Sequence, residues 1–195
     1  LEQNAPDTSP KIVTGLRWNL AELHRQLENG PAIFEVADRM MSVDPDAADS
    51  TSIELLTWID NHALWDVLEK FLAKHQATLE QSKRPLYYAA IARAKQGNAH
   101  EAEQLAEKAA KVDSQTTLES FLAAKDLEEH RQFDWAVREY RRSIDAEKIA
   151  THEGILARVY LASLLHDYEH YQEAADTIEP LAKAVNNDGQ VGQLY

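Results

Sequence analysis

The spacing of apolar residues along the chain predicts helices from one end to the other. Alanine and unbranched helix-forming residues dominate, and no alternation of apolar and polar residues persists for more than a few positions. Residues 12–28 and 31–43 predict a helical hairpin, in which Gly30 ends the first helix and Pro31 opens the second. The run Thr51-Ser52-Ile53-Glu54 fits a capping box at the start of another helix. The fold class is therefore predicted to be all-α.

A repeat of about 34 residues underlies this helical pattern. In three places, an alanine late in one helix stands 12 residues before an alanine early in the next. The pairs are Ala90 and Ala102, Ala124 and Ala136, and Ala162 and Ala174. Small residues at matched positions let two antiparallel helices pack closely. Phe34 and Leu68 extend the 34-residue spacing toward the start of the chain, so about five hairpins are expected.

These features resemble tetratricopeptide repeat (TPR) proteins over roughly residues 83–188. The resemblance rests on the paired alanines, on Gly97 in an inter-helix turn, on Phe133 and Tyr171 opening second helices, and on the run KAAKVD at 108–113. It implies a right-handed α-solenoid of antiparallel helix pairs. Two degenerate hairpins are expected in residues 12–82, and TPR-like repeats in residues 83–116, 117–150 and 151–188. Residues 1–11 are expected to be a polar linker and 189–195 a tail, with 12–188 forming one continuous solenoid domain.

The TPR resemblance implies a concave groove lined by the first helix of each repeat, and a partner is expected to bind there. The implied site residues are Arg84, Tyr87, Ile91 and Lys95 in one repeat, Phe121 and Lys125 in the next, and Val159 and Ser163 in the last. Such a mixed surface suits a peptide whose apolar side chains enter pockets. Some TPR proteins clamp the terminal carboxylate of a chaperone tail in this groove. The resemblance does not extend to that function, because the clamp positions hold Tyr87, Ile91, Leu122 and Tyr160.

The charge of the chain bears on its partners. With 20 basic and 33 acidic residues the formal net charge is −13, which argues against nucleic acid as a partner. The charge is uneven, because residues 83–116 carry +2 whereas residues 1–50 and 151–195 carry −5 each. This distribution favours the middle repeats as the place where a partner docks.

No catalytic or metal-binding pattern stands out. The chain has no cysteine, which excludes disulfides, thiolate zinc sites and cysteine nucleophiles. His166 and His170 have a spacing that can bind zinc from one helical face, but the repeat alignment places them across a turn, and the sequence fixes no third ligand. No phosphate loop, nucleophile elbow or paired-carboxylate motif occurs. We expect no metal, no cofactor and no enzymatic activity.

The sequence therefore predicts a non-catalytic interaction scaffold that binds a partner protein or peptide in its groove. The alternative is a structural spacer or self-association domain of a larger protein that is membrane-anchored or exported. No apolar run approaches the length that spans a bilayer, so no direct membrane insertion is expected in this segment. The first residue is not methionine and residues 1–10 are polar, so we expect a processed protein or a piece of a longer chain. Its localisation, cytoplasmic or exported, stays open.

Overall fold

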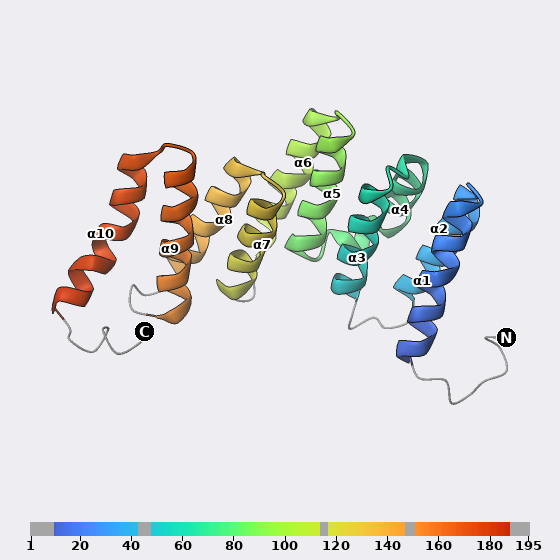
Figure 1. The fold of residues 1–195 in the computed structure, drawn as a ribbon, viewed down its shortest axis with the longest axis horizontal. Coiled ribbons are helices and arrows are strands. Elements are labelled where there is room, and N and C mark those ends of the chain that lie inside the picture. The colour runs from blue at the N-terminus through green and yellow to red at the C-terminus, as the bar shows by residue number, and fades with distance from the viewer. Residues whose placement is uncertain (1–9, 43–47, 114–116, 147–150, 188–195) are drawn as a thin grey trace. The chain divides into compact units, whose positions relative to one another are not determined.

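The chain folds into helical hairpins in the computed structural model, which describes residues 10–42, 48–113, 117–146 and 151–187 (Figure 1). These residues form ten α-helices. They are α1 (Pro10–Gln26), α2 (Gly30–Met41), α3 (Ala48–Asn61), α4 (Trp65–Leu79), α5 (Lys83–Lys95), α6 (Ala99–Lys111), α7 (Thr117–Glu129), α8 (Phe133–Ala146), α9 (His152–Asp167) and α10 (Tyr171–Asn187). Consecutive helices form antiparallel pairs, so the predicted all-α fold with five hairpins is confirmed.

The helices belong to two compact units. Unit 1 covers Leu1–Ala109 and unit 2 covers Ala110–Tyr195, so the boundary falls within α6. The predicted tail lies outside the described residues, as does most of the predicted linker, although α1 already begins at Pro10. The continuity of residues 12–188 as a single solenoid stays a prediction.

Each hairpin turns at one residue in the left-handed conformation. These residues are Glu28, Ala63, Gly97, Arg131 and Glu169, with φ between 50° and 86°. In the turn at Gly97, the Asn98 N–H donates to the Arg93 carbonyl at 3.0 Å, and the Asn98 carbonyl accepts from the Ala102 N–H at 3.0 Å. The same two hydrogen bonds recur in the other four turns. The first bond is the six-to-one bond of a Schellman motif, which satisfies a carbonyl at the end of the first helix, and the second is the first hydrogen bond of the next helix.

Two predictions about helix ends are wrong in detail. The left-handed residue after α1 is Glu28, and Gly30 is the first residue of α2. The Asn29 side chain caps α2 instead, because its Oδ1 accepts from the Ala32 N–H at 3.2 Å. The predicted capping box lies inside α3, where the Ser52 hydroxyl donates to the Asp49 carbonyl at 2.8 Å. A serine that can cap a helix also bonds backward within its first turn, and the sequence pattern does not separate the two arrangements.

The core of unit 1 joins the first five helices. Trp18 of α1 packs edge to face on Trp58 of α3, with ring centroids 5.9 Å apart. The fully buried members of this core include Ala21, Ile33, Leu55, Leu56, Ile59, Leu68 and Phe71. These residues lie on the helix faces at which neighbouring hairpins pack against one another. The turn geometry and the apolar faces therefore favour the same packing of the hairpins.

The alanine pairs of the repeat differ in burial. Ala90 and Ala102 in unit 1, and Ala124 and Ala136 in unit 2, are at most 1% exposed. The third pair, Ala162 and Ala174, is only partly buried. Full burial of the matched alanines therefore holds in two of the three predicted places, although α9 and α10 also pack against each other.

The left-handed turns generate a stability prediction. An L-residue other than glycine pays roughly 1 kcal/mol in this conformation, so Ala63→Gly should stabilise the protein by about 0.5–1 kcal/mol in urea unfolding. The matched control is Gly97→Ala, whose new methyl group meets no atom within 4 Å. It should cost about 1 kcal/mol through backbone conformation alone. A loss of stability in Ala63→Gly would contradict this account of the turns.

A histidine between two hairpins makes unit 1 sensitive to acid. His75 of α4 is 12% exposed in its side chain, and its Nε2 lies 3.2 Å from Asp38 Oδ1 of α2. Its ring packs on Phe71 with centroids 4.7 Å apart. Burial lowers the pKa of His75, and the carboxylate of Asp38 opposes this shift only in part.

The lowered pKa of His75 sets the direction of a pH effect. Below about pH 6.5 the unfolded chain binds a proton at this position more readily than the folded chain. The contribution of His75 to stability is therefore complete above that pH and is lost as the pH falls. Between pH 7.5 and 5.5 the wild type should lose more unfolding free energy than His75→Gln, measured by urea titration. An equal loss in both proteins would contradict the prediction, and His100→Gln on the exposed surface of α6 is the control.

Candidate functional site

The first helices of the two hairpins in unit 2 present a partly apolar face. On α7, Leu118 is 50% exposed and Leu122 is 37% exposed, and one turn further on lies Lys125. On α9, which packs against α7, Val159 is 36% exposed and Ser163 follows four residues later, also exposed. We call the surface formed by these five residues the α7–α9 face. It contains three of the predicted groove residues, namely Lys125, Val159 and Ser163.

Aromatic rings support the α7–α9 face from below. Phe121, the fourth predicted residue of this unit, is 7% exposed, and its ring lies 5.5 Å from that of Tyr160 and 6.0 Å from that of Tyr140. The Lys125 ammonium lies over the Tyr160 ring, 5.1 Å from its centroid, in a cation–π contact. These contacts hold α7 and α9 together, and they position the lysine at the edge of the apolar surface.

A buried hydrogen bond fixes the aromatic cluster. The Tyr140 hydroxyl donates to Glu128 Oε2 at 2.6 Å, and Tyr140 is fully buried. Burial, together with this carboxylate, raises the pKa of Tyr140, so the phenol stays protonated as a donor. The bond joins α8 to α7 and so ties the second helix of this hairpin to the first.

A hollow adjoins the α7–α9 face between α9 and α10. Its volume is about 500 Å³. Val159 and Ser163 lie on its rim toward α7, and the partly buried Ala162 and Ala174 form part of its lining, with exposed Tyr171 beside them. The partly exposed alanines of the third pair therefore line open space next to two of the predicted site residues.

The predicted site residues of unit 1 lie in different surroundings. Tyr87 and Ile91 are buried, at 1% and 2% exposure. Lys95 is exposed, and its ammonium pairs with the nearly buried carboxylate of Asp60 on α3. Arg84 is partly exposed. The accessible members of the predicted set in this unit are thus the two cations.

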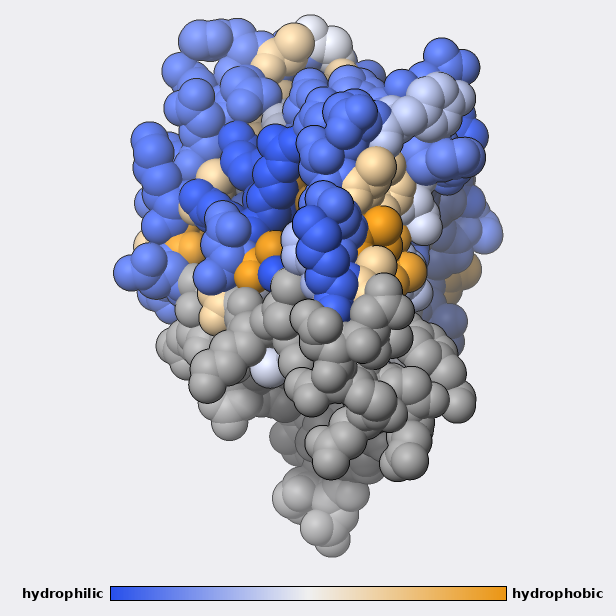
Figure 2. All heavy atoms as spheres, turned by 90° about the vertical axis from the view of Figure 1, so that its left-hand side faces the viewer, coloured by the Kyte–Doolittle hydropathy of each residue, from blue (hydrophilic) through white to orange (hydrophobic). Residues whose placement is uncertain are grey.

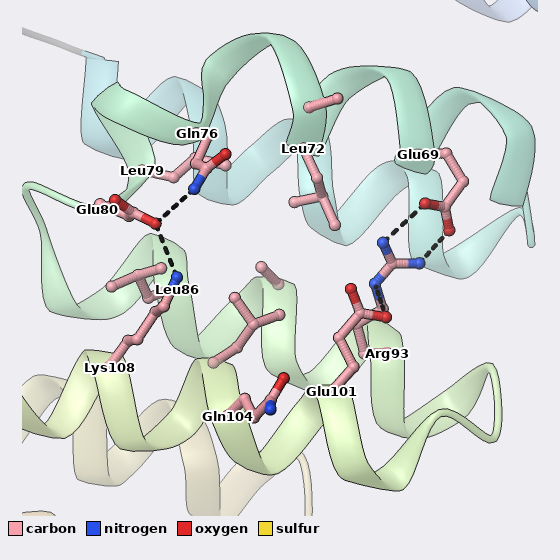
Figure 3. Close-up of a pocket in the computed structure, with 13 residues that line it drawn as sticks. Glu69, Leu72, Gln76, Leu79, Glu80, Leu86, Arg93, Glu101, Gln104 and Lys108 are labelled. Carbon is pink, nitrogen blue, oxygen red and sulfur yellow. Dashed lines mark hydrogen bonds and ion pairs between the residues drawn. The ribbon is translucent and has the colours of Figure 1, made fainter.

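A second cavity, which the sequence pattern does not predict, lies between α4, α5 and α6 of unit 1 (Figure 3). It encloses about 320 Å³. Leu72 lies between two charged clusters, one at each end, and Leu79 and Leu86 lie beside the cluster that contains Glu80 and Lys108 (Figure 3). At one end, Glu80 accepts hydrogen bonds from Gln76 at 2.9 Å and from Lys108 at 3.0 Å.

Arg93 holds the other end of this cavity. Its guanidinium donates two hydrogen bonds to the carboxylate of Glu69, the one from Nη2 at 2.8 Å. Its Nε lies 3.2 Å from Glu101 Oε2, an ion pair without the geometry of a hydrogen bond. The hydrogen bonds from Arg93 lower the pKa of Glu69, and the two carboxylates raise the pKa of Arg93. One cation thus joins α4, α5 and α6.

The repeat in the sequence contains an indication that Arg93 forms an internal ion pair. The same position in the next two hairpins holds Leu127 and Leu165, which are buried. A charged residue at a position where the repeat otherwise buries leucine indicates an internal ion pair, since a lone buried charge is costly. Comparing the repeats for polar exceptions, and not only for shared residues, would have found it.

Repetition of the turn and of the helix pair defines the architecture. The described helices form successive antiparallel pairs that are joined by one recurring turn. The chain is similar to the crystal structure of MamA protein, with 14% sequence identity, coverage of 93% of this chain and 94% of that chain, and a TM-score of 0.43. No protein-family model matches the sequence, and no curated protein matches it.

Among the described helices, none is both long enough and apolar enough to cross a membrane. Within the described ranges, no three His, Asp or Glu side chains are grouped so as to hold a metal ion. His166 lies in the last turn of α9 and His170 directly before α10, so the turn that the repeat alignment predicts separates them.

The ion pairs around the unit 1 cavity predict unequal effects on stability. In the double variant Glu69→Gln and Glu101→Gln, the Arg93 side chain, 6% exposed, loses both counter-charges. We expect a loss of about 2 kcal/mol in urea unfolding, less than for a fully buried pair because both carboxylates are half exposed. The control Glu80→Gln removes only an exposed pair with Lys108 and should cost under about 0.5 kcal/mol. Equal losses in the two proteins would overturn the assignment of Arg93 as an internal bridge.

Proposed function

We propose that the chain is a non-catalytic interaction module that binds a peptide segment of a partner protein on the α7–α9 face. The observation that carries this proposal is the exposure of Leu118, Leu122 and Val159 on two adjacent helices above a rigid aromatic cluster. Exposed apolar side chains on a fixed scaffold are what a partner covers when it binds. Because the apolar area is small, the proposal implies a short segment and not a large domain.

The polar groups of the α7–α9 face indicate how a peptide would be oriented. The Lys125 ammonium is held at the edge of the apolar strip by the Tyr160 ring, and it can still receive a carboxylate or carbonyl oxygen. Ser163 offers a hydroxyl beside the hollow between α9 and α10. A ligand with two or three apolar side chains followed by an acidic residue fits this arrangement.

The predicted contacts of unit 1 have a smaller part in the proposal. Arg84, Tyr87, Ile91 and Lys95 stay predicted contacts, but burial of Tyr87 and Ile91 leaves no accessible apolar surface at those two positions. Peptide binding is therefore assigned to unit 2. The alternative function, a spacer or self-association domain, uses other surfaces and predicts no peptide binding at the α7–α9 face.

Peptide selection tests the proposed function directly. A random peptide library displayed on phage is selected against the full chain, and an enriched peptide is then synthesised with a fluorescent label. Fluorescence anisotropy should show binding that Leu122→Glu combined with Val159→Glu weakens at least about tenfold, because charge replaces the apolar contacts. Circular dichroism checks that both proteins keep their helix content.

The matched control carries the same kind of change on exposed leucines elsewhere. Leu16→Glu combined with Leu23→Glu on α1 replaces two side chains that are 57% and 55% exposed. This variant should bind the peptide within about twofold of the wild type. Failure to enrich any peptide, or equal loss of binding in both double variants, would refute the α7–α9 face as the binding site.

A further inference from the structure

Helix α1 is apolar on two opposite faces. One face carries Trp18 and Ala21, which pack into the core of unit 1. The other carries a stripe of large apolar residues that are exposed to solvent. They are Ile12 at 57% exposure, Leu16 at 57%, Leu20 at 39%, Leu23 at 55% and Leu27 at 72%. Leu27 directly follows α1, and its N–H still donates to the Leu23 carbonyl at 3.1 Å. Steps of three and four residues place all five on one side of the helix, and we call them the α1 stripe.

The folding of unit 1 does not account for the α1 stripe. The end helices of stacked repeats ordinarily carry a polar outer face, which keeps the protein in solution. Helix α10 follows this rule: in the view of its side of the molecule, most described residues are hydrophilic and apolar residues form only small patches (Figure 2). The outer face of α1 is thus apolar, whereas that of α10 is mostly hydrophilic. Exposure of the apolar side chains of the stripe to water is unfavourable.

The spacing of the stripe fits a second copy of this chain. From Ile12 to Leu27 the steps are four, four, three and four residues, which is nearly the same when counted from either end. In an antiparallel pair of such helices, Ile12 of one copy lies opposite Leu27 of the other, and Leu16 lies opposite Leu23. Leu20 then lies next to its own counterpart at the two-fold axis. A surface that matches itself in the reverse direction is what a two-fold symmetric contact requires.

We propose that two copies of this chain associate through the α1 stripe, with their α1 helices antiparallel across a two-fold axis near Leu20. Three charged side chains of α1 that the structure describes, Arg17, Glu22 and Arg25, make contacts within their own copy. Glu22 and Arg25 pair with each other on the same helix, with Arg25 Nε 2.8 Å from Glu22 Oε2. Arg17 donates to the Arg39 carbonyl of α2 at 2.9 Å. These charges are held within their own copy and leave the five apolar residues to face the partner copy.

The exposed area of the stripe predicts the strength of the association. The exposed fractions of the five residues leave roughly 450 Å² accessible in each copy, so pairing them buries at most about 900 Å² in total. This lies just below the size of ordinary specific interfaces and above most chance contacts in crystals. A reversible dimer with a dissociation constant in the micromolar range is therefore expected, not a permanent one.

Cysteine cross-linking tests both the association and its direction, because the chain has no cysteine of its own. Leu20→Cys should form a disulfide-linked dimer on mild oxidation at about 50 μM protein, since its counterpart lies within reach. A mixture of Ile12→Cys and Leu27→Cys chains should form mainly the mixed dimer, and Ile12→Cys alone should form little. Leu122→Cys, an exposed leucine of unit 2, is the control and should stay monomeric.

Sedimentation equilibrium supplies a measurement that does not depend on cysteine. The wild type should show a concentration-dependent dimer, and Leu16→Glu with Leu23→Glu should raise its dissociation constant at least about tenfold. Leu122→Glu with Val159→Glu should leave the constant unchanged. Each double variant is the test in one experiment and the control in the other. Failure of one proposal therefore leaves the other proposal testable.

Several results would overturn the proposal. These are a wild type that stays monomeric up to about 200 μM, a dimer that Leu16→Glu with Leu23→Glu does not weaken, and efficient linkage of Ile12→Cys to itself, which indicates parallel helices. Co-sedimentation of a monomeric wild type with phosphatidylcholine vesicles, abolished by the same glutamate pair, would assign the stripe to a lipid surface instead.

Discussion

In every hairpin, the residue after the left-handed position serves two helices at once: its N–H closes the first helix and its carbonyl begins the second. Two successive helices are thereby joined with a fixed rotation and a fixed axial offset. The apolar faces meet only because this offset is the same each time, since a shift of one residue would turn each face by about 100°. The buried alanine pairs, the aromatic cluster of unit 2 and the ion pairs around Arg93 all depend on that geometry.

Much of this architecture could be predicted from the sequence, because it depends on local periodicity. The alanine spacing predicts a turn between the two members of each pair, and the turns at Gly97, Arg131 and Glu169 do lie between them. Helix ends at Gly30 and Thr51 were predicted less well. Four of the five left-handed positions are not glycine, so residue preference alone pointed to the wrong residue in the first hairpin. In that hairpin the turn holds Glu28 in the left-handed conformation, although this residue type does not favour it.

The candidate site was harder to predict, and α5 and α7 show the reason. Buried residues occur all around α5, including Tyr87, Ala90 and Arg93. Its sequence therefore gives no phase from which an exposed side could be inferred. On α7, Phe121 and Lys125 are both predicted groove residues. Lys125 lies at the edge of the partly exposed strip, whereas Phe121 lies beneath it. Helix phase places a residue on a face, and only the packing of neighbouring helices decides whether that face reaches solvent.

Arg93 also limits how far the hairpins can be treated as interchangeable parts. The corresponding Leu127 and Leu165 need only an apolar environment, whereas Arg93 needs Glu69 from the preceding hairpin and Glu101 from the following helix. Moving this hairpin elsewhere in the array, deleting a neighbour or replacing it with an average repeat would leave a buried cation without its carboxylates. The hairpins are similar to one another, but their order around Arg93 is fixed by this side chain and its two carboxylate partners.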